Sequence, residues 1–280
     1  MSEPAGTPSS AKERSPSDVA EAELHPIVGV HQPNFFPWLG YFHKMRWSDT
    51  FVLLDDVQVP RRSGGSVTNR CELVVNGKRL FVTAPIDRTK SSTMRIDEAR
   101  FSPQEDFRGR LTAILETAYA KAPYFKELGG TLREIVQNPT ESLAAYNTAA
   151  ITRIAEILGL RPRIVASSTL GVQTTSTQRL VDIVERLGGR TYLAGGGAKD
   201  YQDDTLFFAR GINVYYREFV APAYARWKGE PQAGLSVLDA LLVLGPEGTR
   251  KLIDQPLDPG LLRLATEASR SSVTTTGGGT

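Results

Sequence analysis

Short apolar runs alternate with stretches of helical periodicity through most of the chain. The runs are continuous, as in strands buried on both faces of a parallel sheet, and lie at 27–30, 51–54, 163–167, 192–194 and 212–216. Apolar positions at helical spacing occur in the segments 38–47, 107–118, 140–158, 180–187 and 236–244. Strands separated by helices favour right-handed parallel crossovers. The pattern therefore predicts an α/β fold with an open, mostly parallel sheet and flanking helices.

A β-hairpin and a helical segment interrupt this rhythm. Asn76-Gly77 lies between the strand-like segments 70–75 and 79–84. Asn-Gly suits a two-residue type I′ turn, because both positions need positive φ. Two helical segments then follow without a strand between them. We therefore expect a hairpin and a helical insertion at about residues 104–159, inside a single domain of residues 25–262.

The two ends of the chain have a different composition. Residues 1–24 are rich in Ser, Pro, Ala and Glu, and the last residues are SRSSVTTTGGGT. Such segments do not bury enough apolar surface to offset the entropy that is lost on ordering. We expect residues 1–24 and 263–280 to be disordered tails outside the site.

Charge and composition narrow the class of protein. The 33 basic and 31 acidic residues give a net charge of +2, and the longest basic block is Arg61-Arg62, so we expect no nucleic-acid partner. No apolar run approaches the ~18 residues of a membrane span, and the N-terminus lacks a secretion signal. We therefore expect a cytoplasmic protein without a membrane partner. Cys71 is the only cysteine and the three histidines are scattered, so we expect no disulfide, structural metal or cofactor.

The candidate chemistry begins in the loop after the first strand, HQPNFFPWLGY. Open α/β sheets bind ligands beyond the carboxyl ends of their strands, and His31 stands at that end of the first strand. Pro33 and Pro37 stiffen the loop, which suits a pre-organised site. His31 is therefore the predicted catalytic residue, and the alternative is a hydrogen-bonded structural histidine. The aromatic residues of this loop are either core residues or the wall of a pocket.

A second polar segment, LLDDVQVPRRSGGSVTNR, follows the second strand. Asp55 and Asp56 point in different directions along an extended backbone, so one can face the site while the other caps a helix or forms a salt bridge. Arginine and amide groups near a histidine suit a ligand with phosphate or carboxylate oxygens. The alternative is a solvated polar loop with surface ion pairs. The predicted substrate-binding residues in this segment are Gln58, Arg61, Asn69 and Arg70.

Two further candidates have open roles. Gly195-Gly196-Gly197 follows a predicted strand, so its backbone N–H groups either hold an oxyanion or phosphate or form a plain turn. On the first interpretation Gly196 and Tyr201 belong to the substrate site. Asp239 either reaches the site or caps a neighbouring element. The chain contains no P-loop and no GxSxG motif, which argues against a P-loop nucleotide site and an α/β-hydrolase triad.

The segments VHQPNFFPWLGYFHKM and SDTFVLLDDVQVPRRS resemble the WbqC-like protein family. The resemblance continues through AYAKAPYF, LVDIVERLGGRTYLAGGGAKDY, GINVYYREF and LSVLDALLVLG, and it covers about residues 27–250. It implies an accessory enzyme of the transferase class in bacterial glycan or natural-product assembly. Cys71 and the long glycine-rich loop RRSGGSVTNR depart from the family pattern. The matching positions are His31, Gln32, Pro33, Trp38, Gly40, Tyr41, Lys44, Asp55, Asp56, Gln58, Arg61, Asn69 and Arg70.

Together these features predict a group-transfer enzyme that moves an acyl or aminoacyl group onto an amine. His31 is the predicted general acid/base, and Asp55 or Asp56 orients His31 or the amine. Tyr41 completes the predicted catalytic set and positions the substrate. The expected partner is a small-molecule substrate or one tethered to a carrier protein. The predicted substrate-binding residues are Gln32, Asn34, Trp38, Lys44, Gln58, Arg61, Asn69, Arg70, Gly196 and Tyr201.

Three other functions are compatible with these residues. A strand, a loop with His and Pro, and a helix that opens with Gly and an aromatic resemble the HxGH-type nucleotidylyltransferases, with Tyr41 in place of the second histidine. This analogy suggests nucleotidyl transfer. A non-catalytic binding or scaffold protein would show no turnover. A hydrolase would break a thioester or ester without any amine present.

Overall fold

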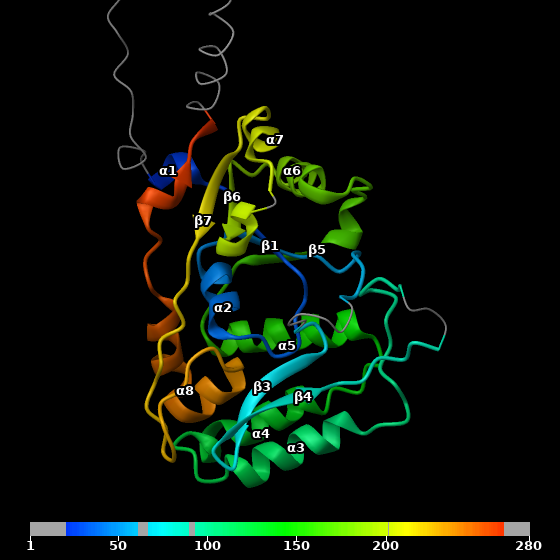
Figure 1. The fold of residues 1–280 in the computed structure, drawn as a ribbon, viewed down its shortest axis with the longest axis vertical. Helices are drawn as coiled ribbons and strands as arrows, with labels where there is room; N and C mark the ends of the chain where they lie inside the picture. The colour runs from blue at the N-terminus through cyan, green and yellow to red at the C-terminus, as the bar shows by residue number, and fades with distance from the viewer. Residues whose placement is uncertain (1–20, 61–66, 90–92, 201, 266–280) are drawn as a thin grey trace, which may run out of the picture.

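The computed structural model describes residues 21–60, 67–89, 93–200 and 202–265. Within these ranges the main sheet has six strands in the order β5-β2-β1-β6-β7-β8 (Figure 1). Every neighbouring pair is parallel except β7 and β8. The predicted open, mostly parallel sheet is therefore confirmed. Its strands are β1 (Ile27–His31), β2 (Thr50–Leu53), β5 (Arg163–Ala166), β6 (Thr191–Gly195), β7 (Asn213–Arg217) and β8 (Leu262–Arg263).

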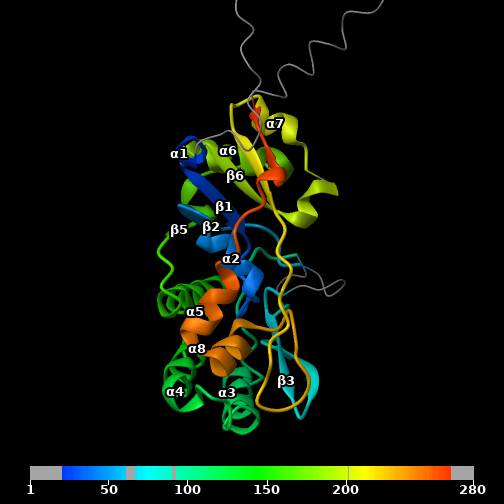
Figure 2. The same cartoon turned by 90° about the vertical axis from the view of Figure 1, so that its left-hand side faces the viewer.

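Helices cover both faces of the sheet, which explains the continuous apolar runs. On one face Phe51 and Leu53 pack in the same cluster as residues of α2 (Leu39–Arg46). On the other face Val28 and Val52 pack with residues of α6 (Ser176–Arg186) and α7 (Asp204–Phe208). Figure 2 shows the sheet edge-on between these layers.

The strand order reverses beside the central strand β1. The chain runs from β1 to β2 and then β5 on one side, and it crosses to β6 and β7 on the other. Pairing between β1 and β6 extends only from Ile27↔Thr191 to Gly29↔Leu193. It therefore stops two residues before each strand ends. In open α/β sheets such a switch point is where ligands bind.

A second lobe, built from the hairpin and four helices, lies beside the sheet (Figure 1). The strands β3 (Arg70–Val75) and β4 (Lys78–Thr83) pair antiparallel. Asn76 and Gly77 connect them with φ of 51° and 77°, as the type I′ turn requires. The helices are α3 (Phe107–Ala118), α4 (Phe125–Val136), α5 (Leu143–Ile157) and α8 (Val237–Ile253).

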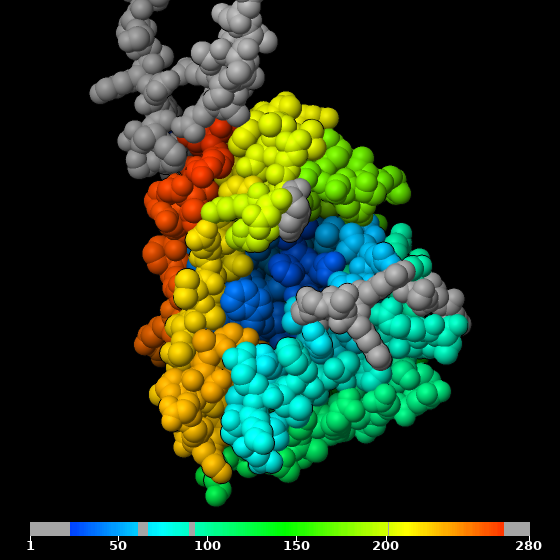
Figure 3. Space-filling model, viewed as in Figure 1, coloured from blue at the N-terminus to red at the C-terminus, as the bar shows by residue number. Residues whose placement is uncertain are grey.

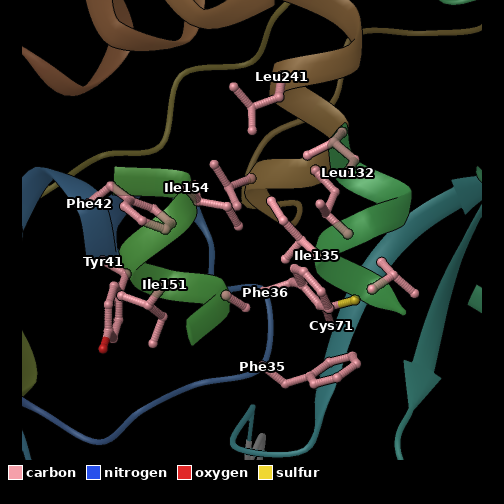
Figure 4. Packing of buried hydrophobic residues seen from close by; sticks show 14 of the residues in the cluster. Phe35, Phe36, Tyr41, Phe42, Cys71, Leu132, Ile135, Ile151, Ile154 and Leu241 are labelled. Carbon is pink, nitrogen blue, oxygen red and sulfur yellow. The ribbon is translucent and has the colours of Figure 1, made fainter. Parts of the chain in front are cut away.

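One apolar cluster joins the two lobes through the loop between β1 and α2 (Figure 4). Phe35 and Phe36 of this loop are each 1% exposed. The Phe35 ring stacks on that of Tyr146 from α5 at a centroid distance of 5.8 Å. These two phenylalanines are therefore core residues, and they fix the loop that carries the candidate site against the second lobe.

The described fold includes a few residues that were expected in the tails. Glu21–Leu24 form the short helix α1, and the turn η4 (Pro259–Leu261) leads into β8. Leu264 and Ala265 beyond β8 are buried. Across the described ranges, no helix combines the length and apolarity that a bilayer crossing requires.

Candidate functional site

His31 ends the central strand β1, beside the switch point. Side chains alternate along a strand, so His31 lies on the face of Ile27 and Gly29, which α2 covers. Its ring contacts Tyr41 of α2 edge-on, with centroids 4.9 Å apart. Its Nδ1 lies 3.1 Å from the carbonyl oxygen of Gln32. Because a carbonyl only accepts, Nδ1 carries the proton, and Nε2 keeps its lone pair.

Lys44 reaches from α2 into the switch point. Its side chain is 2% exposed, and its Nζ donates to the Val30 carbonyl at 2.7 Å. The carbonyls of Ile27 and His31 accept N–H groups from the β2 side. Carbonyl directions alternate along a strand, so that of Val30 points toward β6. The ammonium group thus donates to a strand carbonyl at a position where β1 no longer pairs with β6. The Lys44 Nζ also lies 5.7 Å from the centroid of the Tyr192 ring.

Arg217 ends β7, opposite Gly195 of β6. Its Nη1 donates to the carbonyl of Gly40 in the first turn of α2 at 2.5 Å. Its guanidinium lies 6.0 Å from the ring of Trp38 and 5.9 Å from that of Phe219. The residue is 8% exposed, and its buried Nε has no hydrogen-bond partner among the described residues. Arg217 was not predicted from the sequence.

These three groups form a cationic cluster, which we define as His31, Lys44 and Arg217. Burial, and next the charge of Lys44, lowers the pKa of His31 from 6.5 to about 3. Burial, and next the charge of Arg217, lowers the pKa of Lys44 from 10.5 to about 7. Burial also lowers the pKa of Arg217 to about 10. Among the described residues, no carboxylate forms an ion pair with Lys44 or Arg217. A neutral imidazole therefore stands in a positive field, which suits an anionic ligand.

The surface is hollowed above this region. Figure 3 shows the hollow between the yellow segment around η3 (Gly196–Asp200) and β7 and the cyan hairpin of the second lobe. Blue atoms of the N-terminal part of the fold lie at its base. Gly196 approaches the backbone here, because an added Cβ would stand 3.3 Å from the Arg217 carbonyl oxygen. The hollow thus opens at the carboxyl ends of the strands, where the sequence places the site.

The other predicted residues of the loop after β1 and of the start of α2 have different surroundings. Gln32 accepts from the Thr68 hydroxyl at 3.3 Å, and Asn34 is buried. Trp38 is partly exposed and contacts the ring of Phe219 at 5.6 Å. Tyr41 is 1% exposed, and its hydroxyl has no hydrogen-bond partner among the described residues. Figure 4 shows this hydroxyl pointing away from the apolar cluster.

Asp55 and Asp56 engage a different set of partners at the ends of β2 and β5. Asp55 accepts from the Ser167 hydroxyl at 3.1 Å and from the backbone N–H and hydroxyl of Ser168 at 2.9 and 2.8 Å. Asp56 accepts from the Ser167 hydroxyl at 2.5 Å and forms an ion pair with Arg179. The two carboxylates thus hold the turn η2 (Ser167–Leu170) and α6 against β2. Within the described contacts, neither one hydrogen-bonds to His31.

The remaining predicted residues fall into two groups. Asn69 and Arg70 lie at the start of β3 and line a separate cavity. Gln58 is exposed, and its backbone forms an isolated antiparallel β-bridge with Arg95. Arg61 and Tyr201 lie outside the described residues. The structure therefore brings Trp38, Tyr41, Lys44 and Gly196 close to His31 or Arg217. Gln32, Asp55 and Asp56 contact other residues near the strand ends, and Gln58, Asn69 and Arg70 have neighbours outside the cationic cluster.

Asp239, whose role the sequence left open, lies inside the second lobe. It is fully buried and accepts from the hydroxyls of Tyr119 and Tyr224 at 2.6 and 2.7 Å. It also forms an ion pair with Arg226, whose side chain is 2% exposed. We define Asp239, Arg226, Tyr119 and Tyr224 as the buried acidic network. It joins the segment before α8 to α8 itself and is separate from the hollow.

Asn147 of α5 is a second residue that sequence reasoning missed. Its side-chain amide donates to the carbonyls of Pro33 and Thr68, each at 2.8 Å. It therefore fixes the loop after His31 to the segment before β3. Its polar side chain among the apolar positions of α5 was the available signal. No group of three His, Cys, Asp or Glu side chains with metal-binding geometry occurs in the described ranges.

Fold and site together define an α/β protein with a cationic cluster at the switch point of its sheet. The sequence model of the WbqC-like protein family matches residues 32–251, and the chain belongs to this family. The resemblance seen in the sequence is thereby confirmed. The chain is also similar to the "Uncharacterized protein Rv1507c" of Mycobacterium tuberculosis (strain ATCC 25618 / H37Rv), with 25% identity over 224 residues, which cover 79% of this chain and 94% of the relative. No solved structure matches the chain.

Proposed function

We propose that this protein is a group-transfer enzyme that binds an anionic group of its donor or acceptor at the cationic cluster. The observation that carries the proposal is that Lys44 and Arg217 are buried beside a neutral His31 without a carboxylate partner among the described residues. Buried charges are normally paired, because desolvation without a partner costs free energy. A bound phosphate or carboxylate would supply the missing negative charge.

The Nδ1–H tautomer gives His31 the role of a general base. Its Nε2 lone pair is available, and the low pKa keeps the ring neutral at pH 7 without a ligand. An anion bound beside Lys44 and Arg217 would oppose their charges and raise the pKa of His31 toward neutrality. The ring would then be an effective base only once substrate is bound, because the best catalytic pKa lies near the working pH.

Acyl or aminoacyl transfer to an amine uses these parts as follows. The amine nitrogen attacks the acyl carbon of a thioester or activated ester, and a C–N bond forms. The proton of the amine passes to Nε2 of His31. The bond from the acyl carbon to the leaving sulfur or oxygen breaks, and the imidazolium returns the proton to that atom. In this proposal Gly196 and Trp38 contact the substrate, which is supported by the proximity of both residues to Arg217.

A thermal-shift screen tests ligand binding directly. The ligands are nucleoside triphosphates, nucleotide sugars, coenzyme A thioesters and amino acids. A ligand at 100 times its Kd adds about 2.7 kcal/mol, which raises the midpoint by roughly 5–10 °C for a protein of this size. We expect the shift to be lost in Arg217→Gln and kept in Arg263→Gln, a matched change at an exposed arginine of the neighbouring strand. An equal loss in both variants would argue against the cluster as the binding site.

Turnover separates the catalytic proposal from the scaffold alternative. With a donor found by the screen, His31→Asn should keep the thermal shift and lose most of the amine-dependent release of the leaving group, by about 10²–10⁴-fold. Full turnover in a folded His31→Asn variant would contradict the role of His31. Release of pyrophosphate from a nucleoside triphosphate would instead identify nucleotidyl transfer, for which the same two cations could bind the phosphates.

A further inference from the structure

A separate cavity of about 640 Å³ lies between the hairpin and α3. Its described lining comes from Pro60, the start of β3, most of β4, the loop that follows β4, Glu105 and α3. Figure 1 labels these strands and this helix. The described lining shares no residue with the cationic cluster. Two residues that the sequence assigned to substrate binding, Asn69 and Arg70, belong to this lining. Its volume is within the range of about 300–1,000 Å³ that is typical of small-molecule sites.

Basic side chains predominate in the described lining of this hairpin cavity. Among the described residues that line it, Arg70, Arg88 and Arg110 are basic and Glu105 is acidic. Arg110 donates to the Thr83 carbonyl at 2.5 Å and lies 3.3 Å from Glu105. In that pair both side chains are about half exposed, at 46% and 53%, so solvent screens the ion pair and Arg110 can exchange it for another anion. An arginine fork binds phosphate or carboxylate in a bidentate manner.

Apolar side chains open to solvent lie beside these arginines. Leu80 and Phe81 of β4 are 45% and 46% exposed, and among described large hydrophobic side chains only Val220 is comparably exposed. The Arg70 guanidinium lies over the Phe81 ring at 4.4 Å. Ile114 of α3 adds further apolar surface. Exposed apolar side chains beside fixed cations are typical of a site for a ligand with an anionic end and an apolar body.

We propose that the hairpin cavity is a second binding site, which takes a small anionic ligand with an aromatic or aliphatic body. The anionic group lies among the three arginines, and the body packs on Phe81, which lies on the same face of the hairpin as Arg70. Such a ligand is chemically a phosphate monoester or a carboxylate of an apolar compound. This site goes beyond the proposed function and does not depend on it.

Calorimetric titration of the full chain with benzyl phosphate tests the proposal, with benzyl alcohol and inorganic phosphate as probes of each half. We expect benzyl phosphate to bind best of the three. Arg70→Gln should weaken it about tenfold or more, because a hydrogen bond to a charged group is worth roughly 1.5–3 kcal/mol. Phe81→Ser should weaken it several-fold. Lys78→Gln removes the same charge from the hairpin outside the cavity and should leave the Kd unchanged.

Arg217→Gln distinguishes this site from the cationic cluster. If the proposal holds, benzyl phosphate binds this variant as it binds the parent protein, and of these two arginine variants only Arg70→Gln weakens binding. Loss in Arg217→Gln with retention in Arg70→Gln would place the ligand at the cluster and overturn the second site. Equal weakening by Arg70→Gln and Lys78→Gln, or no saturable binding by the parent protein, would overturn it as well.

Discussion

The two lobes treat buried cations in opposite ways. In the second lobe Arg226 is paired with Asp239, which also accepts from two tyrosine hydroxyls. At the sheet, Lys44 and Arg217 are buried to a similar degree, but their described polar partners are single backbone carbonyls. Both arrangements cost desolvation free energy, and only the first recovers it within the described fold.

This difference separates a structural role from a functional one. A paired network holds two chain segments together and needs no ligand. Unpaired cations at the carboxyl ends of strands are costly for folding, and this cost is recovered when an anion binds. The following changes test this interpretation, from the largest expected effect to the smallest.

Removing the charge of Asp239 should have the largest effect on stability. Asp239→Asn leaves the guanidinium of Arg226 buried without an ion-pair partner, so the free energy of unfolding should fall by about 3–5 kcal/mol. Urea denaturation measures this change. A loss below about 1 kcal/mol would mean that solvent already screens the pair, and the contrast between the lobes would disappear.

Lys44→Met should change how stability depends on pH. The folded pKa of Lys44 is about 7, below its ordinary 10.5, so the unfolded chain binds more protons between these values and stability rises with pH there. Below pH 7 Lys44 is charged in both the folded and the unfolded chain, so the full free-energy cost of burying its charge lowers stability there. From pH 7 to 9 this group adds about 2 kcal/mol of stability. Denaturation at both values should show that this increment is lost in Lys44→Met. An unchanged increment would show that Lys44 is well solvated.

Gly40→Ala should disturb the site through Trp38. The added Cβ would stand 2.3 Å from the Trp38 ring, so this ring, which lies 6.0 Å from the Arg217 guanidinium, must shift. Overpacking costs about 1–3 kcal/mol and the gain in helix propensity offsets about 1 kcal/mol, which leaves a net loss of up to about 2 kcal/mol. Gly130→Ala in α4 meets no atom within 4 Å and should be stabilising. Denaturation and tryptophan fluorescence distinguish the two, and equal stabilisation would contradict the close contact.

The smallest effect is expected at an exposed ion pair. Asp254 pairs with Arg46 and Arg250, and its side chain is 40% exposed. Asp254→Asn should therefore cost less than about 1 kcal/mol, and less still in high salt. Urea denaturation of this variant beside Asp239→Asn gives the contrast between exposed and buried carboxylates. Comparable losses in both would contradict it.

Most of the sheet could be predicted from local pattern alone. Continuous apolar runs marked the strands, and Asn76-Gly77 marked the hairpin turn. The helix α4 was missed because Gly129-Gly130 interrupts its apolar spacing. The strand β8 was missed because it has two residues, and only its partner β7 makes it a strand.

The site was less predictable, because its members come together only through the crossover. His31 and Lys44 follow from one local segment, whereas Arg217 is a single arginine at a strand end with no motif around it. Similarly, the sequence predicted that Asp55 or Asp56 would orient His31 or the amine. Their partner Ser167 is more than 100 positions away, and no spacing rule reveals such a contact.

Nuclear magnetic resonance of the His31 ring tests the central claim most directly. In protein with isotope-labelled histidines, we expect a neutral Nδ1–H tautomer that does not titrate near pH 6.5, because the pKa is about 3. Adding an anionic ligand identified by the thermal screen should raise this pKa by about 1–3, and Arg217→Gln should abolish the rise. A ring that titrates normally in the free protein, or one whose pKa stays near 3 when the ligand is bound, would contradict a ligand-activated base at the switch point.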